Sequence, residues 1–329
     1  MEFNSEVKKA TNSIYQKISD IMPEIEWSTH APYVYEINKL KKEKNAVILA
    51  HNYQTPEIYH GISDFSADSL ALAIEAAKTT ADIIVMCGVH FMAETAKLMS
   101  PNKKVLLPDM RAGCSLSSSI TGEDVRNLKK IHPGVPVVSY VNTSADVKAE
   151  TDVCCTSANA VKIVNSLGVK KVIFLPDDYL AKYVATQTDV EIISWKGTCE
   201  VHEKFNDHEI NEIRKNNPGI KVIAHPECPP DVISASDFTG STSGMIKYVK
   251  EKQPKKVMMV TECSMSDNVQ VDNPDVKFIK PCNLCPHMKR ITLPKILDCL
   301  KNETNEILMS RETIEKARKS VERMTVIGR

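Results

Sequence analysis

Apolar residues in this chain fall into short continuous runs, separated by longer stretches in which they recur every three or four positions. The three leading runs, at 46–50, 136–139 and 221–224, have the length expected for strands covered on both faces. A helical pattern follows each of them, and then a second apolar run, at 82–86, 171–175 and 256–260. A short helix and a third strand complete each segment. This order predicts an α/β fold of three pseudo-symmetric three-layer αβα sandwich units with short parallel sheets.

Three cysteines share this repeating context. Cys114, Cys199 and Cys285 follow one another at a near-constant interval of about 85 residues, and each comes after a short run rich in β-branched residues. Glycine or proline beside each cysteine suits a loop that bends sharply toward a ligand. We therefore expect three α/β units to bring one thiolate each to a common centre, where they hold a metal ion or an iron–sulfur cluster.

The repeat divides the 329 residues into a lead-in and three units, in keeping with the two or three domains expected at this length. Residues 1–32 form a helical N-terminal extension. The first α/β unit takes residues 33–115 together with C-terminal helices at 286–329, the second takes 116–200, and the third takes 201–285. The last helical pattern has one apolar side, so we expect it to pack back on the first unit.

Polar or ionisable side chains follow the leading strand of each unit. The strands end in His51-Asn52-Tyr53, Tyr140-Val141-Asn142 and His225-Pro226-Glu227. Open parallel sheets bind their ligands at this carboxyl edge. We therefore expect these strand ends to face a shared binding site.

A hydroxyl residue marks the start of the helix that follows each leading strand. These residues are Ser69, Ser157 and Thr242. Their side-chain oxygen can accept an otherwise unpaired amide proton at a helix start, and the same amide groups can receive an anion. An ordinary helix cap is the simpler interpretation of any one of them. Three at matching positions favour carboxylate or phosphate binding.

Composition limits the classes of partner and compartment. With 42 basic and 42 acidic residues, the chain shows no electrostatic footprint for nucleic acid or an anionic membrane. The first residues lack the pattern of a signal peptide, and no apolar run approaches membrane-spanning length. We expect a cytoplasmic protein, whose ten cysteines are buried thiols or ligands rather than a disulfide framework.

The remaining cysteines leave two kinds of metal site open. Cys282 forms a C-x-x-C pair with Cys285, and it could supply the fourth ligand of a structural zinc site. Three dispersed thiolates instead suit a [4Fe–4S] cluster with one open iron, and this is the interpretation we favour. Cys87, Cys263 and Cys299 lie on or beside apolar runs, so we expect them to be packing residues.

Short motifs are dispersed along nearly the whole chain, from about residue 45 to about residue 324. They include Leu49-Ala50-His51-Asn52-Tyr53-Gln54, Phe91-Met92-Ala93-Glu94-Thr95-Ala96-Lys97, Thr156-Ser157-Ala158-Asn159-Ala160, Lys196-Gly197-Thr198-Cys199, Val201-His202, His225-Pro226-Glu227-Cys228, Gly240-Ser241-Thr242-Ser243-Gly244-Met245 and Met288-Lys289. In these residues and in their order, the sequence resembles the quinolinate synthase family.

The resemblance implies an activity, a cofactor and a fold. The family condenses iminosuccinate (iminoaspartate) with dihydroxyacetone phosphate, releasing phosphate and water, to make quinolinate for NAD biosynthesis. Its fold is a triangle of three α/β sandwiches around a central [4Fe–4S] cluster held by three cysteines, which correspond here to Cys114, Cys199 and Cys285. An enzyme that oxidises aspartate is the upstream partner implied.

The resemblance also implies the residues that surround the substrate, and they are the strand ends and helix starts described above. Glu227 is expected to be the base for enolisation, while Tyr53 and the histidines orient the triose. The implied substrate-binding residues are His51, Ser69, Tyr140, Asn142, Ser157, His225, Glu227 and Thr242.

Two other functions remain open from the sequence. A hydro-lyase would use the same open iron on another small acid, without consuming a triose phosphate. A zinc-stabilised binding or interaction protein would carry no iron.

Overall fold

The computed structural model describes residues 1–327, and these form three four-stranded sheets with one shared strand order. The first sheet contains β1 (Ala46–His51), β2 (Phe65–Ala67), β3 (Ile83–Cys87) and β4 (Lys104–Leu106) in the order β2-β1-β3-β4. The second contains β5 (Val137–Tyr140), β6 (Val153–Cys155), β7 (Lys171–Leu175) and β8 (Glu191–Ser194) in the order β6-β5-β7-β8. The third contains β9 (Lys221–Ala224), β10 (Phe238–Thr239), β11 (Lys256–Val260) and β12 (Lys277–Ile279) in the order β10-β9-β11-β12.

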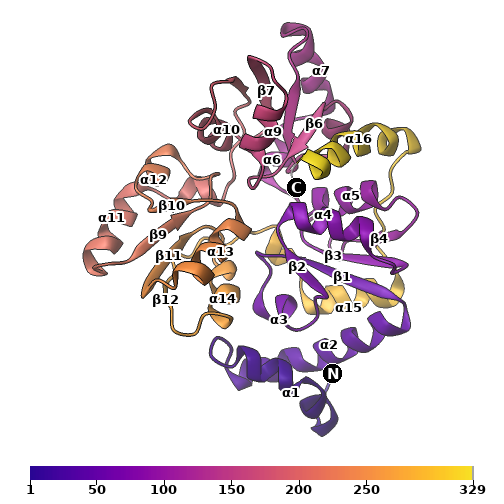
Figure 1. Ribbon diagram of the computed structural model, residues 1–329. Coiled ribbons are helices and arrows are strands. Elements are labelled where there is room, and N and C mark those ends of the chain that lie inside the picture. Colours follow the sequence, from indigo (N-terminus) through magenta and orange to yellow (C-terminus); the bar gives the residue numbers. More distant parts are fainter. Residues whose placement is uncertain (328–329) are drawn as a thin grey trace. The chain divides into compact units, whose positions relative to one another are not determined.

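Helices connect the strands and lie against the sheets (Figure 1). In chain order they are α1 (Ser5–Ile18), α2 (Glu24–Glu43), α3 (Pro56–Tyr59), α4 (Ser69–Lys78), α5 (His90–Met99), α6 (Ser115–Ser118), α7 (Gly122–Ile131), α8 (Ala145–Ala149), α9 (Ala160–Ser166), α10 (Asp178–Ala185), α11 (Asp207–Asn216), α12 (Pro230–Ser234), α13 (Thr242–Lys252), α14 (Ser264–Val271), α15 (Leu293–Asn302) and α16 (Arg311–Ile327). Two short 3-10 helices are η1 (His202–Lys204) and η2 (Met288–Arg290).

The predicted α/β class and the three small parallel sheets are confirmed. Each sheet has one more strand than we predicted, because the edge strands β2, β6 and β10 were missed. These strands are only two or three residues long. Such short segments show no periodicity, so only their pairing with the leading strand reveals them.

Contacts along the chain separate two compact units. The first consists of residues 1–112, 262–278 and 284–307, and the second of residues 113–261, 279–283 and the chain from Leu308 onward. The boundaries that the repeat gave for its three α/β units stay predictions. Residues 328 and 329 of the predicted first α/β unit lie outside the described residues.

The last helix does not pack where we predicted. In the second compact unit, α16 lies against α8 and β6. Ser320 on this helix donates to the backbone oxygen of Lys148 at 3.0 Å and receives a hydrogen bond from the Cys154 thiol at 3.4 Å. The prediction that this helix returns to the first α/β unit is wrong, because an apolar face shows that a helix is covered and not what covers it.

Buried strand interiors hold the strand ends in place. In the second compact unit Val137, Ile173, Leu175, Val222 and Val260 are all fully buried. Each such side chain contributes about 1.5–3 kcal/mol to the free energy of unfolding. The residues that follow these strands therefore project from a rigid frame.

Among the described residues, no helix has both the length and the apolar character needed to cross a bilayer.

Candidate active site

A buried carboxylate lies at the carboxyl end of β9, in the second compact unit. Glu227 is only 3% exposed, and both its oxygens have partners. The Tyr140 hydroxyl, at the end of β5, donates to Oε1 at 2.5 Å. Nδ1 of His202 lies 2.8 Å from Oε2. Two strand ends that are far apart in the sequence thus meet at one carboxylate, as expected for neighbouring carboxyl edges.

The turn after β9 also orients His225. The Glu227 amide donates to Nδ1 of His225 at 3.4 Å, and the Cys228 amide donates to the His225 carbonyl at 3.0 Å. Because Nδ1 is used as an acceptor, Nε2 carries the proton of the neutral ring. Nε2 lies 3.1 Å from the Ser157 hydroxyl, which therefore accepts. Four of the predicted site residues, Tyr140, Ser157, His225 and Glu227, are connected in this way.

Within this cluster of Tyr140, Ser157, His202, His225 and Glu227, the carboxyl of Glu227 carries the negative charge. Burial raises the pKa of its carboxyl, but the His225 and His202 imidazoles and the hydrogen bonds from His202 and Tyr140 outweigh burial, so the pKa falls well below its usual range. Asp177, which precedes α10, behaves oppositely. Burial, and after it the charge of Glu227, raise the pKa of Asp177 well above its usual value. Of these two interacting buried carboxyls, the one near imidazoles favours the ionised form and the other favours the protonated form.

The loop after β5 contains a buried side-chain amide oxygen, Oδ1 of Asn142, that has no hydrogen-bond partner among the described residues. Lys148 is fully buried, and its ammonium group donates to the backbone oxygens of Val141, at 2.8 Å, and Thr143. Asn142 lies between them, and among the described residues its Oδ1 has no hydrogen-bond partner. A buried acceptor left in this state costs about 1–3 kcal/mol unless a donor satisfies it. Asn142 is therefore suited to receive a hydrogen bond from a ligand.

The three hydroxyl residues do not cap their helices, so the simpler interpretation of each does not apply. Asp68 caps α4, with its carboxylate accepting from the Ala71 amide at 3.0 Å, and Ser241 caps α13. Asn159 occupies the capping position of α9. Ser69 and Thr242 are instead the first helical residues, and Ser157 precedes its helix. Their hydroxyls are consequently not used as caps.

The cysteines separate clearly by exposure. Among the described residues, three free cysteines are half-buried, and they are Cys114, Cys199 and Cys285. The other free cysteines, Cys87, Cys154, Cys155, Cys228 and Cys299, are buried.

Two further cysteines, Cys263 and Cys282, are disulfide-bonded. The packing role predicted for Cys263 is therefore incomplete, since this buried residue is also oxidised. Cys282 in this state offers no thiolate as a fourth zinc ligand.

The chemistry of the donors fits a cationic metal centre. In the second compact unit, burial, then the charge of Glu227, and then the Cys114 thiol raise the pKa of Cys199 well above its usual value. The Cys114 and Cys199 sulfurs thus lie close enough to interact. Two neighbouring thiolates beside a carboxylate repel one another, and a cation bound to the sulfurs removes that repulsion.

Cys285 belongs to the first compact unit, where a buried ion pair connects its loop to the turn after β1. Its amide donates to Oε1 of Glu262 at 3.4 Å, and the Lys289 ammonium lies 2.9 Å from the same oxygen. Lys289 also donates to the backbone oxygen of Tyr53 at 2.8 Å. Lys289 therefore connects the loop of Cys285, through Glu262, to the turn that contains His51 and Tyr53.

The predicted site residues fall into two groups. His51, Tyr53, Ser69 and Cys285 belong to the first compact unit. The others, Cys114, Tyr140, Asn142, Ser157, Cys199, His225, Glu227 and Thr242, belong to the second. Convergence of the two groups on one cofactor stays a prediction of the repeat.

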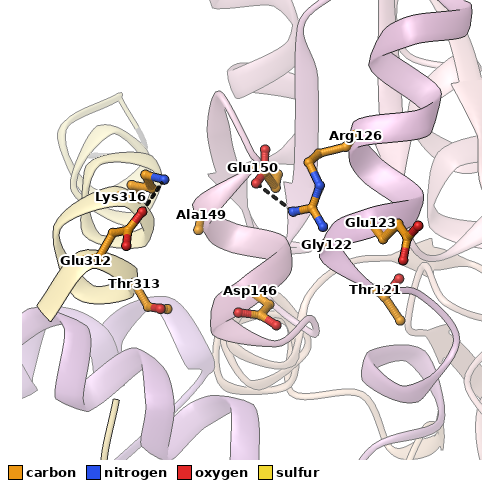
Figure 2. Close-up of a pocket in the computed structure, with 10 residues that line it drawn as sticks. All are labelled: Thr121, Gly122, Glu123, Arg126, Asp146, Ala149, Glu150, Glu312, Thr313 and Lys316. Carbon is orange, nitrogen blue, oxygen red and sulfur yellow. Dashed lines mark hydrogen bonds and ion pairs between the residues drawn. The ribbon is translucent and has the colours of Figure 1, made fainter. Parts of the chain in front are cut away.

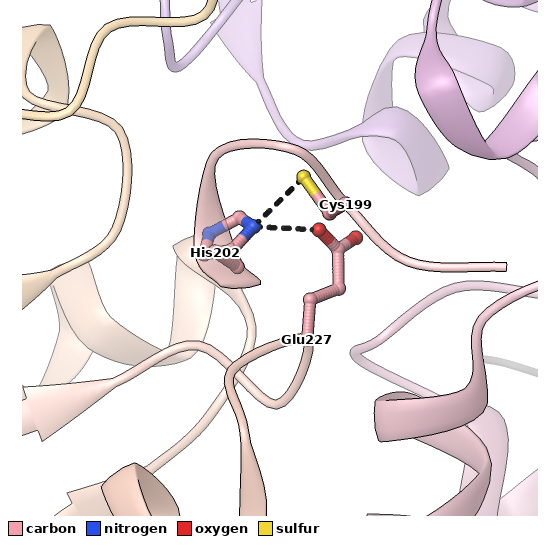
Figure 3. A group of neighbouring side chains, drawn as sticks. All are labelled: Cys199, His202 and Glu227. Atoms are coloured by element: carbon pink, nitrogen blue, oxygen red, sulfur yellow. Dashed lines mark hydrogen bonds and ion pairs between the residues drawn. The ribbon is translucent and has the colours of Figure 1, made fainter. Parts of the chain in front are cut away.

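Three residues of this site were missed from the sequence. His202 contacts both Cys199 and Glu227, and Figure 3 shows the three side chains turned toward one another. Its position three residues after Cys199 was the available signal. Asp177 follows the apolar run of β7, at the same carboxyl edge as the leading strands. Nothing in the sequence sets Lys148 apart from the other lysines.

A hollow elsewhere in the second compact unit shares none of these residues. It has a volume of about 470 Å³ and is lined by Thr121, Gly122, Glu123, Arg126, Asp146, Ala149, Glu150, Glu312, Thr313 and Lys316 (Figure 2). Its two basic groups are already paired, Arg126 with Glu150 at 2.9 Å and Lys316 with Glu312 at 2.8 Å.

Parallel strands that carry thiols, imidazoles and a carboxylate at their ends define an α/β enzyme, in which soft metal ligands accompany acid–base groups. Comparison with known proteins identifies the family. The family model described as Quinolinate synthetase A protein matches residues 35–326, so the chain belongs to the quinolinate synthetase A family.

Similar proteins extend this match over almost the whole chain. A protein named quinolinate synthase from Sinorhizobium fredii (strain NBRC 101917 / NGR234) is 59% identical over 324 residues, which cover 98% of this chain and 90% of the relative. Quinolinate synthase 2 of Mesorhizobium japonicum (strain LMG 29417 / CECT 9101 / MAFF 303099) is 56% identical over 323 residues, covering 98% of this chain and 100% of the relative. Quinolinate synthase of Xylella fastidiosa (strain Temecula1 / ATCC 700964) is 60% identical over 291 residues, covering 88% and 86%.

Proposed function

We propose that the protein is a quinolinate synthase, which condenses iminosuccinate with dihydroxyacetone phosphate and releases phosphate and water, in the biosynthesis of NAD. The observation that carries this proposal is the identity of 59% with a named quinolinate synthase over 98% of the chain. The three half-buried free cysteines and the ionised Glu227 support it.

Cys114, Cys199 and Cys285 are proposed to hold one [4Fe–4S] cluster per chain. When bound, such a cluster supplies an open iron that acts as a Lewis acid toward oxygen or nitrogen ligands. Thiolates are the usual ligands of iron–sulfur clusters, and these three cysteines are half-buried whereas the other cysteines without a disulfide are buried.

Glu227 is proposed as the base. It is ionised at neutral pH because its imidazole and phenol neighbours stabilise the carboxylate. Oε1 and Oε2 are each restrained by one hydrogen-bonded neighbour, so the carboxylate keeps one orientation while it accepts a proton from carbon. The Tyr140 hydroxyl, which donates to Oε1, can return a proton to a departing oxygen.

The remaining residues are proposed to bind and orient the two substrates. Ser157 and Thr242 have hydroxyls beside helix starts, where carboxylates are favoured. The unpaired Asn142 oxygen accepts from an imine or hydroxyl group. His51 and Tyr53, with Ser69, are proposed to orient the triose phosphate.

A cytoplasmic location is also proposed. Eight of the ten cysteines form no disulfide, which supports a reducing compartment, whereas Cys263 and Cys282 are disulfide-bonded, contrary to our expectation for all ten. The imine substrate is unstable, which makes an aspartate-oxidising enzyme the proposed upstream partner.

Anaerobic purification followed by a two-substrate assay tests the proposal. We expect about four irons and four sulfides per chain, and phosphate release only when imine and triose phosphate are both present. The matched controls omit one substrate at a time. Dehydration of a single acid without triose consumption would identify a hydro-lyase instead, and a colourless protein containing zinc would identify a binding protein.

A further inference from the structure

His202 joins the cysteine and the carboxylate of the site through a single nitrogen. Its Nδ1 lies 3.1 Å from the Cys199 sulfur and 2.8 Å from Oε2 of Glu227 (Figure 3). We infer that His202 is a positioning residue, whose Nδ1–H is shared between the cluster ligand Cys199 and the base Glu227. The inference rests on the proposed function, because it takes Cys199 as a ligand of the cluster.

The local backbone explains why this histidine reaches the cysteine. The Glu203 amide donates to the Cys199 carbonyl at 3.0 Å, which closes a turn immediately after the cysteine. His202 begins η1 in this turn, three residues after Cys199. Residues three apart in such a turn lie on one face, so the imidazole returns to the sulfur. The ring is 1% exposed and stacks on His225 with centroids 4.8 Å apart.

The partners of the ring assign its proton. Cys199 as a thiolate and Glu227 as a carboxylate are both acceptors, so Nδ1 must carry a hydrogen. Nε2 lies 3.0 Å from the Thr261 hydroxyl, which is able to donate. With hydrogen on Nδ1, Nε2 can accept from the Thr261 hydroxyl, and this contact orients the ring so that Nδ1 faces Cys199 and Glu227.

A mononuclear metal ion held by the same three side chains fits the distances less well. Zinc bonds of about 2.3 Å to sulfur and about 2.0 Å to nitrogen or oxygen, at tetrahedral angles, separate sulfur from nitrogen by about 3.5 Å and nitrogen from oxygen by about 3.3 Å. The observed separations of 3.1 Å and 2.8 Å are several tenths of an ångström shorter. Separations of this size match hydrogen bonds to charged acceptors.

A shared hydrogen has two separate consequences. Donation to a cluster thiolate draws electron density from the sulfur and raises the reduction potential of the cluster. Donation to Glu227 restrains the rotation of its carboxylate, so the base stays aligned. Removing the imidazole should change the cluster's potential and the turnover together while the cluster stays bound.

The test compares His202→Leu with His202→Asn in anaerobically purified, full-length protein. Asparagine can place an amide N–H near the position of Nδ1, and leucine cannot. His208→Asn is the matched control, because His208 is exposed on α11. The measurements are iron and sulfide content, the midpoint potential of the substrate-free protein, and kcat with KM.

We expect His202→Leu to keep the full iron content, to shift the midpoint potential to more negative values, and to lower kcat about tenfold or more. His202→Asn should recover part of both losses, and His208→Asn should match the unchanged protein. Thr261→Val, which removes the donor to Nε2 while the imidazole stays, should shift the potential in the same direction by a smaller amount. This second variant serves if His202→Leu fails to fold.

Two results would overturn the inference in distinguishable ways. A full cluster with the same midpoint potential in the unchanged protein, His202→Leu and Thr261→Val overturns the role of His202 alone. Loss of iron from His202→Leu, as complete as from Cys199→Ala, makes His202 a ligand and also overturns it. Absence of iron and sulfide from the unchanged protein overturns the proposed function and this inference together.

Discussion

The turns after β1 and β9 have nearly the same backbone and different chemistry. In both, a histidine ends the strand or follows it directly, and the amide two residues later donates to its Nδ1. The distance is 3.2 Å in the turn of His51 and 3.4 Å in the turn of His225. In both, the amide three residues later donates to the histidine carbonyl at 3.0 Å. The same backbone amide therefore orients the histidine ring in two separate sheets.

What differs is the residue whose amide makes the first contact. In the turn after β1 it is Tyr53, whose ring packs edge-on against His51 with centroids 4.7 Å apart. In the turn after β9 it is Glu227, whose carboxylate is surrounded by imidazole and phenol groups. The repeated fold fixes the position of the turn, and one side chain decides whether it carries a neutral ring or a charged base.

The largest effect should come from removing that charge. Glu227→Gln keeps the size of the side chain and one acceptor oxygen, so it can accept from Tyr140 or from His202 but not from both, and it cannot accept a proton from carbon. We expect iron content to stay unchanged and kcat to fall about 10²- to 10⁴-fold, the usual contribution of a general base. Steady-state assays with both substrates measure this. Glu209→Gln on the exposed surface of α11 is the control, and an unchanged kcat in Glu227→Gln would remove this residue from the mechanism.

Replacing the partner of His225 should have a smaller effect. Ser157→Ala removes the hydroxyl that accepts from Nε2, so the ring loses one of the contacts that fix its plane. We expect kcat to fall about tenfold and KM for the imine to rise, since the same hydroxyl is proposed to bind its carboxylate. Ser166→Ala, at the other end of α9, should leave both constants unchanged. Equal kinetics in the two variants would contradict a role for the Ser157 hydroxyl.

The two turns also show what a sequence can predict. Both follow continuous apolar runs, and the carboxyl edge of a parallel sheet is a binding edge in general, so His51, Tyr53, His225 and Glu227 could be selected from register alone. The cysteines were selected by their interval. In the structure these three cysteines are half-buried, whereas the other cysteines without a disulfide are buried. The sequence distinguished the two groups only through the repeat.

Other parts were hidden because they depend on tertiary contacts. His202 is one of nine histidines, and only the turn after Cys199 brings it to Glu227. Asp177 caps α10, with its carboxyl accepting from the Leu180 amide at 2.9 Å. Its raised pKa arises from burial and from Glu227, neither of which a local pattern reveals. The packing of α16 against α8 and β6 likewise depends on tertiary contacts.

The stability of the protein should depend on pH through Asp177, whose pKa is shifted in the opposite direction to that of Glu227. The pKa of Asp177 is higher in the folded protein than in the unfolded chain, because burial and the charge of Glu227 oppose ionisation. The folded state therefore binds more protons, and stability falls as pH rises from the unfolded pKa of about 3.9 toward the folded value. Each pH unit in that window costs up to about 1.4 kcal/mol.

Asp177→Asn should remove this loss, because asparagine is neutral and still caps α10. Urea unfolding at pH 5 and pH 8 measures the difference between the variant and the unchanged protein. We expect the variant to gain stability relative to the unchanged protein at pH 8 and little at pH 5. Asp207→Asn in the exposed first turn of α11 is the control. A relative gain that is the same at both pH values would show that Asp177 is ionised in the folded protein.

The smallest effect concerns the short helices that follow the two turns. His60 is the C-cap residue of α3, the helix after β1, and Ala235 is the C-cap residue of α12, the helix after β9. Burial, opposed only in part by the charge of Asp272, lowers the pKa of His60 to about 4. The unfolded chain then binds more protons, so His60 lowers stability as pH falls from about 6.5 toward 4.

His60→Ala copies the residue of the other turn and should remove this sensitivity to acid. Because the ring is partly exposed, we expect the unchanged protein to lose only about 1 kcal/mol more than the variant between pH 7 and pH 4.5. Denaturant midpoints at the two pH values measure this difference, with His208→Ala as the exposed control. If His60→Ala and the unchanged protein lose stability in parallel, His60 is protonated in the folded state, and the two turns do not differ in this respect.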